Sequence, residues 1–595
     1  MSADFVIGID LGTTNSVLSY AALNTETPTI ELLPIPQLVA PQTVETHTTL
    51  PSFLYLPTGQ EGNGAHDLPW QSNPESVVGR YARQQSADVP DRTVGAAKSW
   101  LCHSKVDRHA AILPWNAPDD VPKVSPVEAS RRYLEHLVAA WSEAFPSTPI
   151  ADQRVVLTVP ASFDASAREL TREAALAAGL PDDLVLLEEP QAAVYAWLQE
   201  VGDEWRKILT VEDTLLVCDV GGGTTDLSLV TVVDEGGDFV LQRLAVGEHL
   251  LVGGDNMDLT LAHYVAGLFE EKGISLDPWQ SVSLWHSCRA AKEALLAPDG
   301  PETHTVSVLG RGSRLIGGTV SVEVERKAAQ QILAEGFFPE CALTDRPKRQ
   351  RVSGFQDIGL PFESDPAVTR HLAAFLTAHG SGKAVHPSHV LFNGGVFKGE
   401  NLTTRLMNVL GDWFNEEGQK PQVLAGTHDL DHAVARGAAF YGWSKETGGL
   451  RIRGGTARAY YVGIETAGLA IPGAPRPLRA LCVVPFGMEE GTEADVPSGE
   501  IGLVVGEAAQ FRFFKSSVRK EDRPGDTLPK APTEELEETD PLETVLPPDE
   551  DSEDPFVPVK FHSKVNELGL LELWCVSTQT DKRWKLEFSV REDGE

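Results

Sequence analysis

Basic side chains are scarce in this sequence relative to acidic ones. The chain has 50 Lys and Arg against 86 Asp and Glu, a formal net charge of −36 and a pI near 4.8. Nucleic acid and anionic membrane surfaces would repel such a chain before contact, so we expect neither as the main partner. An acidic surface suits solubility and the binding of basic peptides.

Long apolar segments and closely spaced cysteines are also missing. No run of about 18 apolar residues occurs that could span a membrane, and the start, MSADFVIGIDLG, has no basic region followed by an apolar signal segment. The six cysteines are scattered, with no CxxC pair and no zinc-like spacing with histidine. The sequence therefore predicts a protein of the reducing cytoplasm without a zinc site.

The Walker A phosphate-binding pattern is missing as well. Gly382-Lys383 lacks the earlier glycine of that pattern and is followed by Ala384, where Ser or Thr is required. If the chain binds phosphates, it must hold them with a different arrangement of glycines.

Such an arrangement is present in the stretch CDVGGGTTD at residues 218–226. An apolar strand over residues 215–218 leads to Asp219, and the glycines at 221–223 remove every Cβ where backbone N–H groups would approach phosphate oxygens. Asp226 closes the turn. Taken alone, this pattern is also compatible with a glycine-rich hairpin between two core strands.

A second turn of the same kind lies near the N-terminus. The apolar strand Phe5–Ile9 ends at Asp10, which is followed by Leu11, Gly12, Thr13, Thr14 and Asn15. Two strand–Asp–Gly/Thr turns about 210 residues apart predict duplicated halves that face one ligand. Mg²⁺ bound to a polyphosphate suits such a pair, because it keeps several waters and is usually held through one or two carboxylates.

The pattern of predicted secondary structure changes at about Trp443. Before it, apolar strands alternate with helical segments, which is typical of α/β architecture. After it, short strand candidates are separated by Gly and Pro turns, the pattern of an all-β region. Residues 531–556 carry eleven acidic residues, five prolines and no basic residue, which predicts a disordered acidic loop.

Seven motifs, in this order along the chain, carry a resemblance to the 70-kDa heat-shock chaperones (DnaK-like) of the actin-like ATPase superfamily: IGIDLGTTNS (7–16), TVPASF (158–163), EEPQAAVYAW (188–197), CDVGGGTTDLSLV (218–230), GGDNMD (253–258), NGGVFK (393–398) and DHAVARGAA (431–439). The resemblance implies an α/β actin-like two-lobed ATPase domain with ribonuclease H-like duplicated halves over residues 1–445. A linker at 446–458 and a smaller β-sandwich-like, substrate-binding-like domain at 459–595 would follow, the latter with a disordered acidic loop at about 520–556.

The same resemblance implies a nucleotide site for ATP or ADP with Mg²⁺, with K⁺ as a further candidate ion. Asp10 and Asp219 would hold Mg²⁺ through waters. The implied catalytic residues are Lys98, Glu189, Asp219, Thr224 and Asp226, with Lys98 near the γ-phosphate and Glu189 orienting the metal's waters. The implied nucleotide-binding residues are Asp10, Gly12, Thr13, Thr14, Asn15, Gly221, Gly222, Gly223, Thr224, Gly253, Gly254, Lys292, Gly394, Gly395, Lys398 and Asp431.

The sequence departs from the family at the adenine-facing positions and at the J-domain surface. Arg289, Glu293 and Leu296 replace a Glu, a basic residue and a Ser, and Lys398 replaces an arginine that stacks on the base, which puts base selectivity in question. Val185 stands where the family has an arginine for an acidic J-domain residue, so a J-domain co-chaperone is left undecided.

The family's helical lid and apolar-acidic linker have no counterpart in the sequence. We therefore expect a slow ATPase and lidless chaperone-like protein, whose nucleotide state controls a β-rich region that binds unfolded or peptide-like clients. One alternative is an actin-like ATP-dependent scaffold or assembly factor that docks one dedicated partner without binding peptide. Another is a small-molecule kinase, which would need a general-base Asp beside a sugar pocket.

Overall fold

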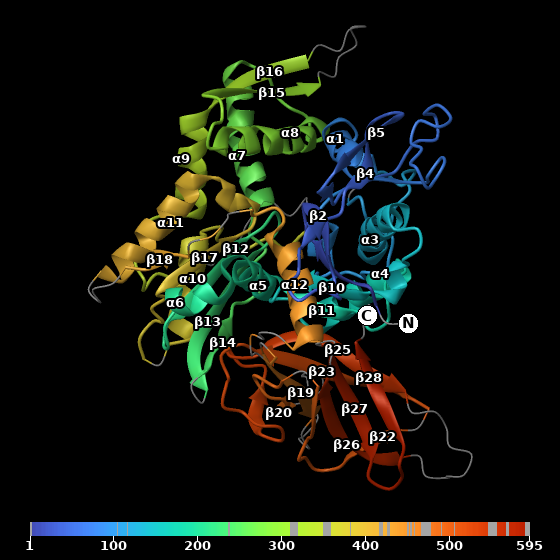
Figure 1. Cartoon of the computed structure of the whole chain (residues 1–595), viewed down its shortest axis with the longest axis vertical. Coiled ribbons are helices and arrows are strands. Elements are labelled where there is room, and N and C mark those ends of the chain that lie inside the picture. Colours follow the sequence, from blue (N-terminus) through green and yellow to red (C-terminus); the bar gives the residue numbers. More distant parts are fainter. Residues whose placement is uncertain are drawn as a thin grey trace, which may run out of the picture.

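The computed structural model places helices and sheets together up to residue 447 and strands alone beyond it (Figure 1). It describes residues 3–588 except 104, 116, 236–237, 310–318, 349–358, 381, 416–419, 425, 427–428, 449–451, 453–454, 457, 466–477, 490, 505, 546–555 and 567–569. The predicted mixed α/β class and the predicted β-rich C-terminal region are both confirmed. No helix among the described residues is long and apolar enough to cross a membrane.

The first sheet contains the N-terminal strand and its turn. Its strand order is β11-β10-β1-β2-β3, formed by β11 (Val185–Glu188), β10 (Arg154–Val159), β1 (Phe5–Leu11), β2 (Asn15–Ala22) and β3 (Glu31–Leu32). The strand β1 pairs antiparallel with β2 and parallel with β10, and β10 pairs parallel with β11. A two-residue strand, β6, also pairs with β2.

The second sheet repeats this arrangement around the glycine-rich turn. Its order is β14-β13-β12-β17-β18, formed by β14 (Asp238–Val246), β13 (Thr225–Glu235), β12 (Thr214–Val220), β17 (His389–Asn393) and β18 (Gln422–Val423). The strand β12 pairs antiparallel with β13 and parallel with β17, and β17 pairs parallel with β18. Order and direction match the first sheet strand for strand, as duplicated halves would require.

Two small-residue helices pack between the sheets. These are α5 (Glu189–Val201) and α12 (Ala433–Thr447), and α12 lies directly on β1. The approach requires glycine: a Cβ on Gly8 of β1 would meet the carbonyl oxygen of Ala435 at 2.4 Å, and one on Gly437 would meet that of Ala192 at 1.7 Å. The small residues of α5 and α12 thus let the backbones of these two helices and of β1 approach closely.

The outer faces of both sheets are covered by amphipathic helices. On the first sheet these are α3 (Pro126–Ala144) and α4 (Ala165–Ala177), and the Ser125 side chain caps α3 by accepting from the Glu128 N–H at 3.0 Å. On the second sheet they are α9 (Arg326–Phe337), α10 (Val368–Ala378) and α11 (Glu400–Trp413). Each pair of layers encloses a buried aliphatic and aromatic core.

Smaller elements extend both halves on the side where the two turns lie. The remaining bounds are β4 (Ile35–Ala40), β5 (Thr43–His47), β6 (Leu50–Pro51), β7 (Leu54–Tyr55), β8 (Val77–Val78), α1 (Arg80–Asp88), β9 (Thr93–Val94), α2 (Ala97–Trp100), α6 (Trp205–Ile208), α7 (Gly254–Glu271), α8 (Pro278–Leu296), β15 (Thr303–Leu309), β16 (Thr319–Glu325) and the 3₁₀ helix η5 (Gly395–Lys398). Figure 1 shows α1 beside the end of α8.

The C-terminal region forms one ten-stranded antiparallel sheet that bends over its own core. Its strands are β19 (Ala459–Glu465), β20 (Leu478–Val484), β21 (Thr492–Asp495), β22 (Ile501–Val504), β23 (Ala508–Ser516), β24 (Thr527–Ala531), β25 (Glu537–Val545), β26 (Phe556–Val565), β27 (Leu571–Ser577) and β28 (Arg583–Phe588). The short pairing of β25 with β28 joins the two halves of the sheet. Side chains from both halves, such as Phe513 and Phe561, share one core.

The expected disordered acidic loop at about 520–556 is wrong over much of its length. Residues 527–531 and 537–545 form β24 and β25, whereas 546–555 lie outside the described residues. Lys515 and Arg512 of the neighbouring β23 pair with Glu537 and Glu538, at 3.3 and 2.5 Å. The acidic run is ordered because basic side chains of an adjacent strand offset its charge. The predicted linker, 446–458, also lies partly outside the described residues.

The C-terminal sheet packs against the N-terminal halves through a seam of buried polar contacts. The seam contacts include Arg108 Nη2 to Asp540 Oδ2 (2.9 Å), Lys515 Nζ to Asp164 Oδ2 (3.6 Å), Thr539 Oγ1 to Asp164 Oδ2 (3.1 Å), Arg458 Nη1 to the Ser162 carbonyl (2.8 Å) and Lys520 Nζ to the Leu244 carbonyl (3.0 Å). Arg108, Asp540, Arg458 and Lys515 are all buried.

Candidate nucleotide-binding site

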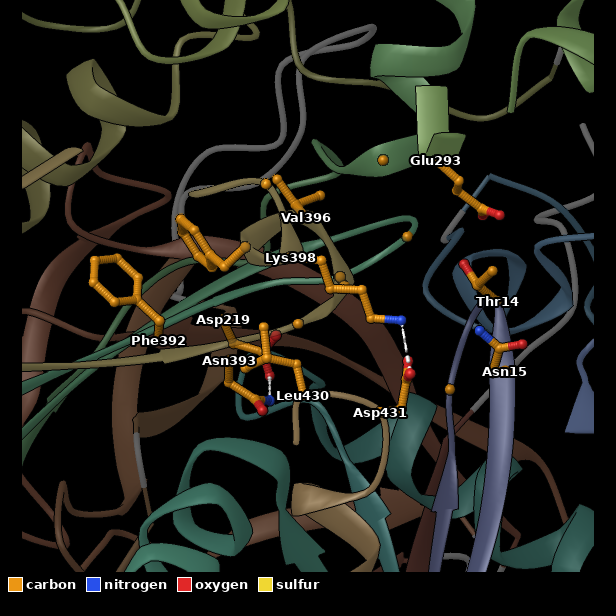
Figure 2. Close-up of a pocket in the computed structure, with 18 of the residues that line it drawn as sticks. Thr14, Asn15, Asp219, Glu293, Phe392, Asn393, Val396, Lys398, Leu430 and Asp431 are labelled. Carbon is orange, nitrogen blue, oxygen red and sulfur yellow. Dashed lines mark hydrogen bonds and ion pairs between the residues drawn. The ribbon is translucent and has the colours of Figure 1, made fainter. Parts of the chain in front are cut away.

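The two glycine-threonine turns meet at the base of one cavity of about 900 Å³. A Cβ on Gly222 would come within 1.8 Å of Thr14 Oγ1, so the second turn fits against the first only because Gly222 has no side chain. Figure 2 shows Thr14 and Asn15 on one side of this cavity and Asp219 and Asn393 on the other. The sequence prediction that both turns face one space is therefore met by the geometry.

Each sheet delivers one carboxylate to the cavity from the carboxyl end of a central strand. Asp10 ends β1 opposite Thr158 of β10, whose Oγ1 lies 3.3 Å from Asp10 Oδ1. Asp219 ends β12 opposite Asn393 of β17, whose Nδ2 donates to Asp219 Oδ2 at 2.6 Å. The parallel neighbour of each strand thus fixes the carboxylate, which is a consequence of the repeated topology.

Lys98 and Glu189 form a buried ion pair between these two carboxylates. Lys98 lies on α2 and Glu189 begins α5, and only 8% and 12% of their side chains are exposed. Nearby negative charges hold the pKa of Lys98 above its ordinary value even though burial opposes this. Lys98 therefore carries a fixed positive charge on the cavity wall.

The carboxylates outnumber the cations in this cluster. Burial, reinforced by the charge of Glu189, raises the pKa of Asp10 to about 7 and that of Asp226 to about 6. Burial and the same glutamate also raise the pKa of Asp219. Four carboxylates with one lysine leave net negative charge in a buried space, which fits the charge of a divalent cation.

The donor set fits Mg²⁺ better than a metal bound wholly by protein. Among the described residues, no group of three or more His, Cys, Asp or Glu side chains lies close enough to hold a metal ion directly. Asp10 and Asp219 are instead single carboxylates on opposite walls of the cavity. Mg²⁺ is commonly held this way, through one or two carboxylates, waters and phosphate oxygens.

The structure brings most of the sequence-predicted site residues to this cavity. Its lining includes Asp10, Gly12, Thr13, Thr14, Asn15, Lys98, Glu189, Asp219, Gly221, Gly222, Thr224, Gly254, Lys292, Gly394, Gly395, Lys398 and Asp431. Three predicted residues lie behind the wall. Gly223 packs against Ser99 and Thr13, Gly253 packs under the carbonyls of Gly221 and Gly222, and Asp226 accepts the Ser162 N–H at 3.2 Å.

Sequence reasoning missed two groups of polar residues in and around the cavity. Asn393, which orients Asp219, precedes two predicted glycines, and its place at a strand end was the available signal. Asp255 and Asp258 lie within the GGDNMD motif, one helical turn apart on α7, and both accept from Arg289 of α8, at 2.5 and 2.9 Å. Only the packing of α7 on α8 reveals that pairing.

The charged residues that depart from the family pattern form ion pairs within the protein. Glu293 of α8 binds Arg83 of α1 at 2.7 Å, and Lys398 of η5 binds Asp431 at 2.6 Å (Figure 2). The first pair joins α1 to α8, and the second joins η5 to the segment before α12. Both therefore link the two halves of the structure across the cavity.

Comparison with known proteins agrees with this architecture. Residues 64–311 match the family model described as Hsp70 protein. Two similar curated proteins are each described as a chaperone protein HscA homolog. The one from Bordetella petrii is 30% identical over 299 residues, 49% of this chain and 41% of the relative. The one from Azotobacter vinelandii is 32% identical over 305 residues, 49% of this chain and 42% of the relative.

The matched part of this chain thus spans less than half the length of these relatives. The family model covers the second glycine-rich turn, Lys98, Glu189 and all of α7 and α8, and the first turn lies before it. The match, the relatives and the paired turns show that this part of the chain is similar to the Hsp70 (DnaK-like) family.

Proposed function

We propose that this protein binds ATP with Mg²⁺ in the cavity and hydrolyses it slowly to ADP and phosphate. The observation that carries the proposal is the meeting of the two glycine-threonine turns around the buried pair Lys98–Glu189. Phosphoryl transfer needs in-line positioning and charge neutralisation more than a strong base. A cavity with backbone N–H groups from two turns, one buried ammonium and several carboxylates provides both.

The residues would divide the work as follows. Thr13, Thr14 and the glycines at 221–223 would hold the β- and γ-phosphates, while Asp10 and Asp219 would hold Mg²⁺ through waters. When bound, Mg²⁺ would neutralise phosphate charge. Lys98 would contact the γ-phosphate and the attacking water, and Glu189 would orient waters, since both side chains face the cavity. K⁺ is a further ion that such an anionic cavity could accept.

We further propose a chaperone role in which nucleotide state controls the β-rich region, residues 459–595, as the client-binding part. A short chain of contacts supports the coupling. Asp226, behind the phosphate turn, accepts the N–H of Ser162, and the carbonyl of Ser162 accepts from Arg458 at 2.8 Å. Arg458 immediately precedes β19, so a displacement of Asp226 would be transmitted through these contacts to the start of the C-terminal region.

The ATPase rate of the wild type and of Lys98→Ala, with and without extended apolar peptides, tests both proposals. Lys207→Ala is the matched control, because Lys207 is exposed and pairs with Glu204, three residues earlier in the chain. We expect Lys98→Ala to lower the turnover rate by about a hundredfold or more, while Lys207→Ala leaves it unchanged. Nucleotide binding, measured separately, should survive Lys98→Ala.

The peptide arm separates the two functional classes. Faster hydrolysis in the presence of peptide supports the chaperone role. Hydrolysis that depends on Lys98 but is unaffected by any peptide supports the alternative, an ATP-dependent scaffold that docks one dedicated partner. No Lys98-dependent hydrolysis would contradict the ATPase proposal itself.

A further inference from the structure

The end of the cavity away from the carboxylates is lined mainly by apolar side chains, and this bears on which nucleotide the proposed site accepts. The course of α8 shows which end of the cavity lies away from the phosphate turn. Lys292 Nζ lies against Gly254, beside the phosphate turn, and donates to its carbonyl at 2.7 Å. Leu296 follows four residues later on the same face of α8 and lies farther from the turn. The base of a nucleotide whose phosphates occupy the turns would reach the space beside Leu296.

The facing wall of this space comes from η5 and the adjoining strand. Val396 and Phe397 of η5, Phe392 of β17 and Leu430 line it, and Gly399 at the end of η5 approaches Leu296 closely enough that an added Cβ would contact it at 3.6 Å. Figure 2 shows Phe392 and Val396 on the far side of Lys398 from Thr14 and Asn15. Aliphatic and aromatic side chains thus flank this end from both sides.

The ionic side chains near this space are already paired within the protein. Arg289 binds Asp255 and Asp258, and Lys292 binds Asp258 at 2.7 Å. These side chains are buried, with Asp258 fully so. Turning Arg289 toward a base would leave Asp255 buried without its partner, and turning Lys292 would remove one of the two cations that neutralise Asp258. Such a rearrangement is strongly disfavoured.

The remaining charged side chains at this end belong to the rim, and Thr403, which also lines the cavity, is half-buried and donates to the Phe397 carbonyl at 3.4 Å. Glu293 and Lys398 carry the ion pairs that link the two halves, and about half of each of their side chains is exposed. Glu400 and Thr404 also line the cavity and are exposed. Among the described residues that line this end, no buried ionic side chain is left to bond the edge of a base.

We infer that this site holds the nucleotide base by apolar packing and does not read its hydrogen-bonding edge, so that it accepts purine nucleotides generally. An apolar pocket discriminates weakly between bases that differ in polar substituents, whereas a pocket built to hydrogen-bond one group rejects analogues that lack it by factors of about 10⁴–10⁵. ADP and GDP should therefore bind with dissociation constants within about a hundredfold of each other. The inference rests on the proposed nucleotide-binding function.

The experiment is a competition assay on the full chain, in which ADP, GDP and IDP displace a fluorescent ADP in the presence of Mg²⁺. Dissociation constants within about a hundredfold of one another support the inference. A preference for ADP larger than this overturns it and leaves the proposed function standing. If no nucleotide binds, the proposed function fails and the inference fails with it.

Two variants test whether the base is held by apolar packing. Leu296→Ala should weaken all three diphosphates by the same factor and leave their ratios unchanged, because it removes packing and no hydrogen bond. It should not weaken inorganic pyrophosphate, which reaches only the phosphate turns. Val282→Ala, on the exposed face of the same helix, is the control and should change nothing. A change in the ADP to GDP ratio with Leu296→Ala would overturn the packing argument.

Discussion

Arg108 and Asp540 lie 432 residues apart in sequence and form a buried ion pair, with Nη2 and Oδ2 separated by 2.9 Å. Their side chains are 2% and 6% exposed, which is unusual for an ion pair that joins two parts of a chain. Burial raises the pKa of Asp540, while the neighbouring Arg108 opposes the rise. The carboxylate therefore depends on this arginine to remain charged in the seam.

Arg108→Ala should destabilise the protein by about 3–5 kcal/mol, because it leaves Asp540 buried without its partner. Arg108→Ala/Asp540→Ala should cost less than the sum of the two single changes, since the double variant leaves no unpaired charge. Arg512→Ala is the matched control: it breaks an exposed pair with Glu538 on the same sheet and should cost about 0–1 kcal/mol. Calorimetric unfolding measures all four. Equal losses of unfolding free energy for Arg108→Ala and Arg512→Ala would show that the buried pair stabilises the protein no more than an exposed one.

A buried histidine makes the same seam sensitive to acid. His249 Nδ1 lies 2.6 Å from Ser162 Oγ, and burial, aided by Lys515 and Arg458, lowers the pKa of His249 to about 3. Above pH 6.5 the histidine is neutral in both folded and unfolded chains and contributes no pH dependence. As the pH falls from 6.5 toward 3, only the unfolded chain gains the proton, so stability is lost at up to about 1.4 kcal/mol per pH unit.

His249→Gln should remove this share of the acid sensitivity. Melting temperatures of wild type and variant at pH 7.5 and pH 5.0 give the comparison, and the variant should lose less between the two conditions. His263→Gln, on the exposed face of α7, controls for the loss of a histidine and should follow the wild type. If the melting temperatures of His249→Gln and wild type fall by the same amount between the two pH values, His249 does not limit stability in acid.

The ion pair Arg83–Glu293 joins α1 to α8 across the proposed nucleotide site and is partly exposed, at 28% and 49%. An exposed pair is worth about 0.2–1 kcal/mol and is screened by salt. Arg83→Ala should therefore speed the release of fluorescent ADP by about two- to fivefold at low ionic strength. The difference from wild type should shrink at high salt.

The reversed pair tests whether the effect is electrostatic. Arg83→Glu/Glu293→Arg should restore slow release, and Lys207→Ala, which breaks an exposed pair far from the cavity, should leave the release rate unchanged. Stopped-flow fluorescence measures each rate. Slow release that persists in Arg83→Ala at low salt would show that the pair does not restrain the two halves.

Local sequence patterns were sufficient to predict the two phosphate turns. Asp10 and Asp219 each end an apolar strand and precede small residues, and both features are encoded within about ten residues of chain. The register that places Asn393 beside Asp219 is set by the pairing of β12 with β17, which the sequence does not display. The residues that line the cavity could thus be predicted from the sequence, but the contacts that orient their side chains could not.

The acidic run near the C-terminus shows why composition alone failed. The prediction of disorder treated Glu537, Glu538 and Asp540 as unpaired charges. In the structure, their partners come from β23 and, for Asp540, from Arg108 in the first part of the chain. The alternation of buried Asp540, Leu542 and Thr544 along β25 is a strand signal that the charge had masked.

Two glycine-to-alanine substitutions in helices should have opposite effects. A Cβ on Gly437 of α12 would lie 1.7 Å from the carbonyl oxygen of Ala192 and 2.9 Å from the N of Ala196, both backbone atoms of α5 that cannot move independently of the helix. Gly437→Ala should therefore force α5 and α12 apart and destabilise the protein by about 3 kcal/mol. Gly267 of α7 has open space where its Cβ would be, so Gly267→Ala should stabilise the protein by about 0.5–1 kcal/mol through helix propensity alone.

Because α12 also lies on β1, which carries Asp10 near its end, Gly437→Ala should weaken nucleotide binding as well, whereas Gly267→Ala should not. Thermal unfolding and fluorescent-ADP binding measure the two effects, and a Gly437→Ala protein as stable as the wild type would disprove the close packing of α5 on α12.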